Sequence, residues 1–152
     1  MAERVIAGSD HAGLVLRAEV VRVAREKGFE VEDLGPLSGD SVDYPDYARK
    51  VAEAVAAGRA RFGVLVCGTG IGMSIAANKV KGVRAAHCGN ELEARMARAH
   101  NDANVLCLGE RVLGLGLGAA VVTAFLEQPF EGGRHQRRID EITAIENGEI
   151  PT

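Results

Sequence analysis

A thiol followed by a run of glycines is the part of this sequence best suited to chemistry. Cys67 precedes Gly68-Thr69-Gly70-Ile71-Gly72, so a thiol, a hydroxyl and three glycines stand together. The apolar run before Cys67 predicts a strand, and the small residues after Gly72 predict a helix. A strand that enters such a turn and then a helix directs backbone N–H groups and the positive end of the helix dipole at the loop. The stretch therefore predicts a pocket for an anion or oxyanion with a thiol at its edge.

The local sequence supports two interpretations of Cys67. A helix N-terminus and a glycine loop stabilise a thiolate, which could remove a proton from a bound sugar phosphate. A free cysteine is also commonly a small buried hydrophobic residue, and we interpret Cys88 and Cys107 in this way. Local sequence alone does not separate the two interpretations of Cys67.

A basic cluster, Arg134-His135-Gln136-Arg137-Arg138, opens the last expected helix. The helix dipole disfavours cations in a first turn, and a bound phosphate would compensate them. Arginine's planar fork suits phosphate, and Arg134 and Arg138 would share one helical face. The cluster therefore predicts a phosphate site, with a solvated basic face as the alternative.

Further candidates stand near other expected strand ends. Asp10 and His11 follow the first strand, and Cys67 ends the third. Ligands of open parallel sheets bind beyond the carboxyl ends of the strands where strand order reverses, so we expect these three residues to face one crevice. His100 closes a helix before the fifth strand, where it could act in the site or interact with the helix dipole. Arg111, after the fifth strand, is a further phosphate candidate.

Neither glycine cluster of the chain is a nucleotide-binding fingerprint. Met73 occupies a position where G-x-G-x-x-G needs a small residue, and no Gly-Lys-Ser/Thr follows the first cluster. The second cluster, Gly114-Leu115-Gly116-Leu117-Gly118, is interpreted as a site of tight helix packing.

The elements that must position these residues alternate between short apolar runs and segments of helical period. Strands are expected at 5–8, 29–34, 62–67, 83–88 and 105–108, and helices at 14–27, 45–57, 91–99, 113–126 and 136–146. A further helix is expected to follow the third strand and to end near Lys79. This alternation predicts an α/β protein with a five-stranded parallel sheet. The alternation of apolar and acidic residues in 29–34 places that strand near an edge. No strand follows the last helix, which is free to reach a neighbouring molecule.

Composition narrows the class of protein. The 152 residues favour a single domain, 1–152, and the net charge of −3 argues against nucleic acid as a partner. No apolar run approaches about 20 residues, so no membrane partner is expected. Three cysteines without C-x-x-C spacing suggest neither a disulfide framework nor a zinc site. With no signal-peptide pattern, a cytoplasmic location is expected.

Several separated motifs resemble those of the type B ribose-5-phosphate isomerases, a family that includes the galactose-6-phosphate isomerase subunits. The motifs keep the family's order and spacing from about Val5 to Glu146. They are Gly8-Ser9-Asp10-His11-Ala12-Gly13, Asp43-Tyr44-Pro45, Cys67-Gly68-Thr69-Gly70-Ile71-Gly72, Ser74-Ile75-Ala76-Ala77-Asn78-Lys79, His100-Asn101-Asp102-Ala103-Asn104-Val105 and Gly132-Gly133-Arg134-His135-Gln136-Arg137-Arg138.

The resemblance implies a Rossmann-like three-layer α/β/α sandwich. It implies a homodimer, paired into tetramers in some members, with a C-terminal helix that reaches the partner and active sites between subunits. A phosphorylated sugar is the implied substrate, and neither a cofactor nor a metal ion is required.

The resemblance also implies a role for each site residue. Cys67 moves a proton between C1 and C2 of open-chain ribose 5-phosphate through a cis-enediolate, a reaction of the pentose phosphate pathway. The Thr69 hydroxyl and the five backbone amides of Gly68, Thr69, Gly70, Ile71 and Gly72 hold the enediolate oxygen, while His100 opens the furanose ring. The implied substrate contacts are Asp10, Tyr44 and Asn101, with His11, Arg111, Arg134 and Arg138 for the phosphate.

One branch of the family uses a carboxylate four residues after the cysteine position as its base. Ile71 occupies that position here, so the chain resembles the thiol branch. Isomerisation of allose 6-phosphate, erythrulose 4-phosphate or galactose 6-phosphate is an alternative that the sequence leaves open. A non-catalytic nucleotide-binding module is another, and it would need neither Cys67 nor His100.

Overall fold

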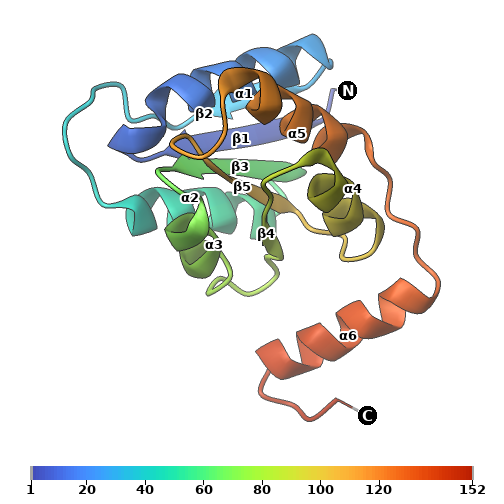
Figure 1. Ribbon diagram of the computed structural model, residues 1–152. Helices are drawn as coiled ribbons and strands as arrows, with labels where there is room; N and C mark the ends of the chain where they lie inside the picture. The colour runs from blue at the N-terminus through green and yellow to red at the C-terminus, as the bar shows by residue number, and fades with distance from the viewer. Residues whose placement is uncertain (1, 152) are drawn as a thin grey trace.

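Five parallel strands form one sheet in the order β2-β1-β3-β5-β4 (Figure 1). The computed structural model describes residues 2–151. The strands are β1 (Arg4–Ser9), β2 (Glu30–Asp33), β3 (Phe62–Cys67), β4 (Ala85–His87) and β5 (Val105–Gly109). Strand order reverses between β1 and β3, and β2 is an edge strand, as its alternating sequence predicted.

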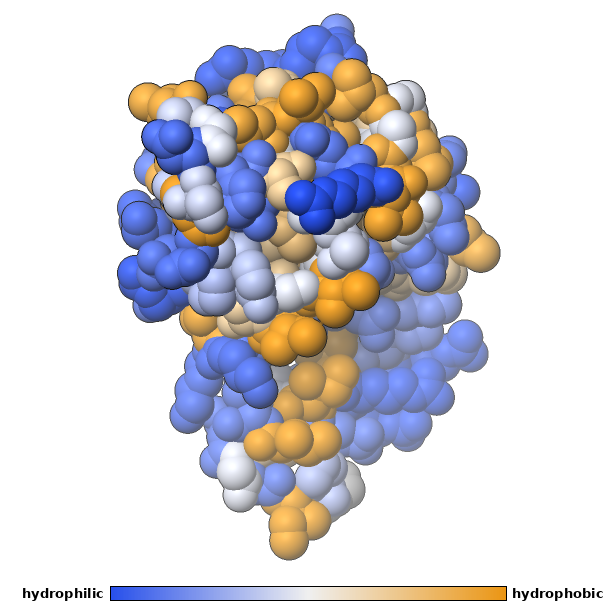
Figure 2. Space-filling model, turned by 60° about the vertical axis from the view of Figure 1, so that its left-hand side comes forward, coloured by the Kyte–Doolittle hydropathy of each residue, from blue (hydrophilic) through white to orange (hydrophobic). Residues whose placement is uncertain are grey.

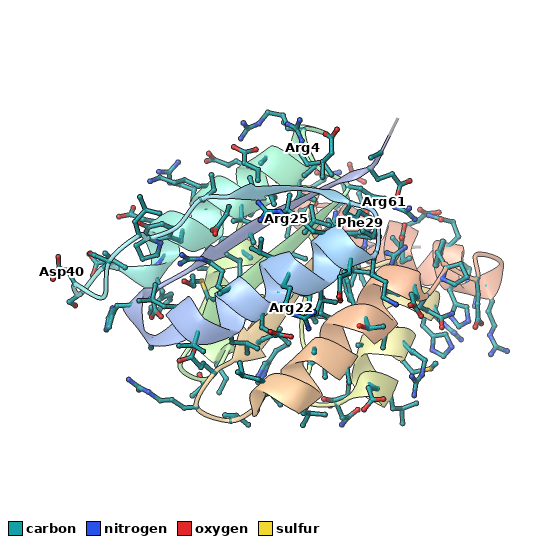
Figure 3. The ribbon with its side chains drawn as sticks, turned by 90° about the horizontal axis from the view of Figure 1, so that it is seen from above. Arg4, Arg22, Arg25, Phe29, Asp40 and Arg61 are labelled. Atoms are coloured by element: carbon teal, nitrogen blue, oxygen red, sulfur yellow. The ribbon has the colours of Figure 1, made fainter. Side chains whose placement is uncertain are left out.

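Helices cover both faces of this sheet. One face is covered by α1 (Leu14–Glu26), α4 (Glu91–Ala99) and α5 (Leu115–Glu127). The other is covered by α2 (Tyr44–Ala56) and α3 (Ile71–Ala77). Figure 3 shows α1 and α5 side by side over the sheet. The predicted three-layer α/β/α sandwich is therefore confirmed.

The core is built around the central strand. Every residue of β3 is buried, which is why its sequence is an unbroken apolar run. The ring of Phe62 packs edge-on against that of Phe125 from α5, with the ring centroids 5.4 Å apart. This packing anchors β3, so the loop after Cys67 leaves a rigid strand.

Some predicted boundaries and one packing interpretation are wrong. The expected helices 113–126 and 136–146 begin instead at Leu115 and Arg134, and the helix expected to end near Lys79 ends at Ala77. Within the second glycine cluster, a Cβ added at Gly118 would lie 2.5 Å from Leu16 Cδ1, as tight packing requires. Gly114 and Gly116 have open space beside them, so tight packing does not explain those two glycines.

The last helix, α6 (Arg134–Glu146), lies outside the three layers (Figure 1). Ile142 and Ile145 on this helix are exposed. Figure 2 shows hydrophobic surface running down this protruding part of the molecule. A groove of about 580 Å³ separates α6 from the β4 side of the body and is lined in part by both isoleucines and Asn101. No helix within residues 2–151 is long and apolar enough to cross a bilayer.

A buried arginine ties the end of α4 to the loop that leads into β5. The Arg98 side chain is 4% exposed, and its Nη1 donates to Asp102 Oδ1 at 2.8 Å and to the Ala103 carbonyl at 2.7 Å. Its guanidinium also lies over the Phe62 ring, 4.7 Å from the centroid. These contacts fix the chain on both sides of His100 and Asn101.

Arg98→Met is expected to lower the free energy of unfolding by about 2–3 kcal/mol, because it removes buried charge-assisted hydrogen bonds. Urea denaturation measures the loss. The matched control is Arg22→Met on the outer face of α1 (Figure 3), where the exposed Arg22 side chain pairs with Glu19 and Glu26. That change is expected to cost less than about 1 kcal/mol. Equal losses in the two variants would contradict the role assigned to Arg98.

Candidate functional site

A pocket of about 460 Å³ opens at the carboxyl end of the sheet, beside the point where strand order reverses. Such a place is where open α/β sheets bind ligands. Loops after β1, β3 and β5 and the first turns of α2 and α3 form its wall. The lining residues are Asp10, Tyr44, Cys67, Gly68, Thr69, Ile71, Gly72, Ile75 and Arg111.

Cys67 stands at the inner edge of this pocket. It ends β3, is 5% exposed, and its Sγ accepts a hydrogen bond from the Gly70 N–H at 3.1 Å. The Gly70 N–H therefore points directly at the sulfur. Gly70 has a φ of +85°, and a Cβ there would lie 2.8 Å from His87 Cδ2. Glycine at position 70 therefore lets the loop fold back onto the sulfur.

The next residues of the loop offer a hydroxyl donor. The Ile71 N–H donates to Thr69 Oγ1 at 3.2 Å, which leaves the Thr69 hydroxyl hydrogen to point elsewhere. Two of the five amides expected to hold an oxyanion, those of Gly70 and Ile71, are thus used inside the loop. The amides of Gly68, Thr69 and Gly72 are the better candidates for an oxyanion.

Three polar side chains shape the rest of the pocket. Asp10 Oδ1 accepts the Ala12 N–H at 2.9 Å, which holds the Asp10 side chain in place. The Tyr44 ring lies against Gly72, where an added Cβ would come within 2.7 Å of it. Arg111 covers Gly68, and a Cβ there would lie 3.2 Å from Arg111 Nη1. The site thus combines a thiol, a carboxylate, a phenol and a cation.

His11 lies beside this pocket rather than in its lining. Its Nδ1 accepts the Val42 N–H at 3.2 Å, so the neutral ring carries its hydrogen on Nε2. Val42 belongs to the segment between β2 and α2, which projects from the body as far as Asp40 (Figure 3). The predicted crevice therefore brings Asp10 to Cys67 directly and holds His11 at its rim.

The predicted residues His100, Arg134 and Arg138 lie away from this pocket, towards the amino ends of the strands. Cys67 pairs with Gly109 at the end of β5, whereas His100 precedes Val105 at the start of that strand. Four steps along a strand span about 13 Å, so the thiol lies at the carboxyl end of the strands and the imidazole of the same chain lies towards their amino end. Arg134 and Arg138 on α6 stand near His100 rather than near the pocket.

His100 stacks on a histidine that the sequence did not single out as a separate candidate. The rings of His100 and His135 lie 4.2 Å apart at 11°. Burial and then the charges of His100 and Arg134 lower the pKa of His135. Glu131, also not predicted, places Oε1 3.8 Å from His100 Nε2 and 3.7 Å from His135 Nε2. The spacing of residues 131 and 135 is the only sequence signal for this group.

Comparison with known proteins gives one consistent result. The family model described as Ribose/Galactose Isomerase matches residues 5–142. The chain belongs to the ribose/galactose isomerase family. Ribose-5-phosphate isomerase B of Escherichia coli is 49% identical over 144 residues, which are 95% of this chain and 97% of that one. The resemblance stated from the motifs is confirmed, and the chain is an isomerase.

Solved structures of this family share the fold described above. The ribose-5-phosphate isomerase B of Clostridium thermocellum superposes with a TM-score of 0.93 at 50% identity, covering 95% of this chain and 98% of that one. The Mycoplasma genitalium enzyme, solved with bound ribulose 5-phosphate, superposes with a TM-score of 0.93 at 46% identity. The superposition covers 97% of this chain and 98% of the Mycoplasma genitalium chain.

One trio of side chains in this isomerase has the composition of a metal site. The ligand atoms of His100, Glu131 and His135 all lie within 4.8 Å of one another, a grouping that the sequence did not predict. A metal ion lies in the plane of each imidazole that binds it. The two rings are stacked nearly parallel, so their nitrogens cannot both point at one ion. The arrangement does not fit a metal centre without a rotation of one ring.

Alkylation with iodoacetamide is expected to modify Cys67 alone, because it is the one of the three cysteines that lines the pocket described above. Burial raises the pKa of Cys88 to about 12, with a smaller contribution from Glu93, and burial also raises the pKa of Cys107. Peptide mass spectrometry after mild treatment at neutral pH locates the adduct. Ribose 5-phosphate should slow the modification. Labelling of Cys88 or Cys107 ahead of Cys67 would contradict the prediction.

Proposed function

We propose that this chain interconverts ribose 5-phosphate and ribulose 5-phosphate by proton transfer through a cis-enediolate. The observation that carries the proposal is the position of Cys67. Its sulfur ends the central strand, accepts the Gly70 N–H and faces a pocket whose lining includes Asp10 and Arg111. The relatives named above support the choice of substrate, since one of them is a structure with ribulose 5-phosphate bound.

The proposed chemistry begins with the open-chain aldose. The Cys67 thiolate takes the hydrogen from C2 as a proton, and the electron pair of the C–H bond forms the enediolate while the carbonyl oxygen O1 becomes negative. The Thr69 hydroxyl and the amides of Gly68 and Gly72 stabilise that oxygen, each donor contributing about 3–4 kcal/mol. The thiol then returns the proton to C1, and transfer of the O2 proton to O1 leaves a ketone at C2.

A second copy of the chain completes the proposed site. His100, Asn101, Arg134 and Arg138 are too far from the thiol of their own chain to act with it, so those of a neighbouring copy would face it. The exposed isoleucines Ile142 and Ile145 on the protruding α6 support a homodimer, because such a face is stabilised by burial. Pairing of such dimers into tetramers is compatible with this arrangement.

The phosphate of the substrate is assigned to Arg134 and Arg138 of that neighbouring copy, with His11 at the pocket rim. Two arginines four residues apart can bind phosphate oxygens with parallel hydrogen bonds. His11 presents Nε2–H as a further donor. Binding the phosphate far from C1 and C2 lets remote binding energy position the reacting carbons. No cofactor is assigned to the reaction.

An isomerase assay over a panel of sugars tests the proposed substrate. We expect kcat/KM for ribose 5-phosphate to exceed that for allose 6-phosphate, galactose 6-phosphate and erythrulose 4-phosphate by at least about tenfold. Ribose without phosphate serves as the control. Its kcat/KM should be about 10³-fold lower than that of ribose 5-phosphate, because it cannot form the charge-assisted hydrogen bonds of the phosphate. A preference for a hexose or tetrose phosphate would contradict the substrate, and no turnover of any phosphosugar would contradict the reaction.

A further inference from the structure

One carboxylate lies beside the stacked imidazoles, and the steps proposed above do not use it. Glu131 Oε1 stands 3.8 Å from His100 Nε2 and 3.7 Å from His135 Nε2. Across residues 2–151, neither imidazole pairs with another carboxylate. Glu131 therefore faces His100, the residue to which the family resemblance assigns opening of the furanose ring.

The backbone holds Glu131 in this place. Its N–H donates to the carbonyl of Ala99, the last residue of α4, at 3.0 Å. Gly132 and Gly133 follow with φ values of +66° and +57° and turn the chain into α6. Because of this turn, His135 of α6 stacks on His100 at the end of α4, and Glu131 of the connecting segment lies beside both rings.

We infer, resting on the proposed function, that Glu131 is a positioning residue for ring opening. Its carboxylate accepts the Nε2 hydrogen of His100, which leaves His100 Nδ1 to take the proton of the anomeric hydroxyl. The C1–O4 bond then breaks, its electron pair goes to O4, and O4 takes a proton from water while C1 becomes the aldehyde carbon. The imidazolium returns its proton to water.

The charges around His100 explain why a carboxylate is needed there. His100 stacks on the imidazole of His135, and the charges of Arg134 and Arg138 on α6 act on that second ring. Glu131 is the anion of this group, and it stabilises the imidazolium that forms when the proton arrives. His135 is largely buried and its pKa is lowered, so it offers His100 a neutral surface to stack on.

The geometry is close to the one that the step requires. Separations of 3.7–3.8 Å exceed a hydrogen bond by less than about 1 Å. Hydrogen bonds of catalytic groups are often long without substrate and tighten when it binds. The Glu131 side chain is 53% exposed, so a rotation can close the gap.

Glu131→Gln separates ring opening from proton transfer. We expect kcat for ribose 5-phosphate, which is a closed ring in solution, to fall about 10- to 100-fold. Exchange of the C1 hydrogen of ribulose 5-phosphate with D₂O should stay within about twofold, because this ketose has no furanose ring to open. The matched control is Glu127→Gln, which removes a nearby carboxylate whose partner is the exposed Lys27. It should leave both rates unchanged.

The outcomes of this experiment are distinct. An unchanged ribose 5-phosphate turnover in Glu131→Gln would overturn the inference, and so would an equal fall in both rates, which would mean a structural role. If the unsubstituted protein neither turns over ribose 5-phosphate nor exchanges the C1 hydrogen, the proposed function fails instead.

Discussion

Cys67→Ala is expected to lower kcat for ribose 5-phosphate by about 10³-fold or more. A positioned general base contributes about 10²–10⁴-fold, and the variant removes the thiol at the point where the central strand meets the pocket. KM should change by less than about threefold, because the base gains its interaction in the transition state. Initial-rate kinetics give both constants, and exchange of the C1 hydrogen of ribulose 5-phosphate in D₂O should disappear with turnover.

Cys88→Ala is the matched control for this variant. Cys88 is buried near the end of another strand and lines no part of the pocket, so its removal should leave kcat within about twofold. Retention of a tenth or more of the activity by Cys67→Ala would exclude the thiol as the base. The pocket would then have to use Asp10 or Tyr44.

Arg134→Met is expected to lower kcat/KM for ribose 5-phosphate by about 100-fold. Loss of one charge-assisted contact to phosphate removes about 2–3 kcal/mol of binding, and about 1.4 kcal/mol corresponds to each tenfold. The variant and the unsubstituted protein should convert ribose, which has no phosphate, at the same slow rate. This split identifies the phosphate, rather than the sugar, as the partner of Arg134.

Arg137→Met provides the comparison on the same helix. Arg137 lies between the two proposed phosphate ligands in sequence, but it is exposed and lines a different pocket, together with Asp140 and Glu141. Its loss should change kcat/KM by less than about twofold. Equal effects of Arg134→Met and Arg137→Met would point to general electrostatic attraction instead of a specific contact.

The sequence predicted the sheet and one half of the candidate site well. Alternating apolar runs and helical segments are determined by local periodicity, so the five strands and their parallel orientation follow from it. The rule for ligand binding in open sheets then places Asp10 beside Cys67, and the pocket contains both. The motif residues Tyr44, Thr69 and Arg111 line the same pocket because they stand at the ends of neighbouring elements.

The half of the candidate site around His100 could not be predicted, because it depends on contacts between residues far apart in the sequence. Nothing local in the sequence places Glu131 near His100, because their proximity depends on the path of the chain through Gly132 and Gly133. The same holds for Arg98, whose burial over Phe62 depends on packing between α4 and the sheet. Helix ends shifted by two residues at Arg134 and Leu115, since a cap depends on backbone angles rather than on periodicity.

The central claim is that one working site needs Cys67 of one copy and His100 of another. Two singly substituted chains, Cys67→Ala and His100→Ala, can be co-expressed with different affinity tags and the mixed assembly purified through both tags. In a mixed dimer both substitutions fall in one site and the other site is intact.

The isomerase activity of that mixed dimer is the most direct measurement. We predict about half of the specific activity of the unsubstituted protein on ribose 5-phosphate, although each substituted chain alone is strongly impaired. A mixed dimer as impaired as its parents would contradict the claim, because each of its chains would then carry a defective site of its own.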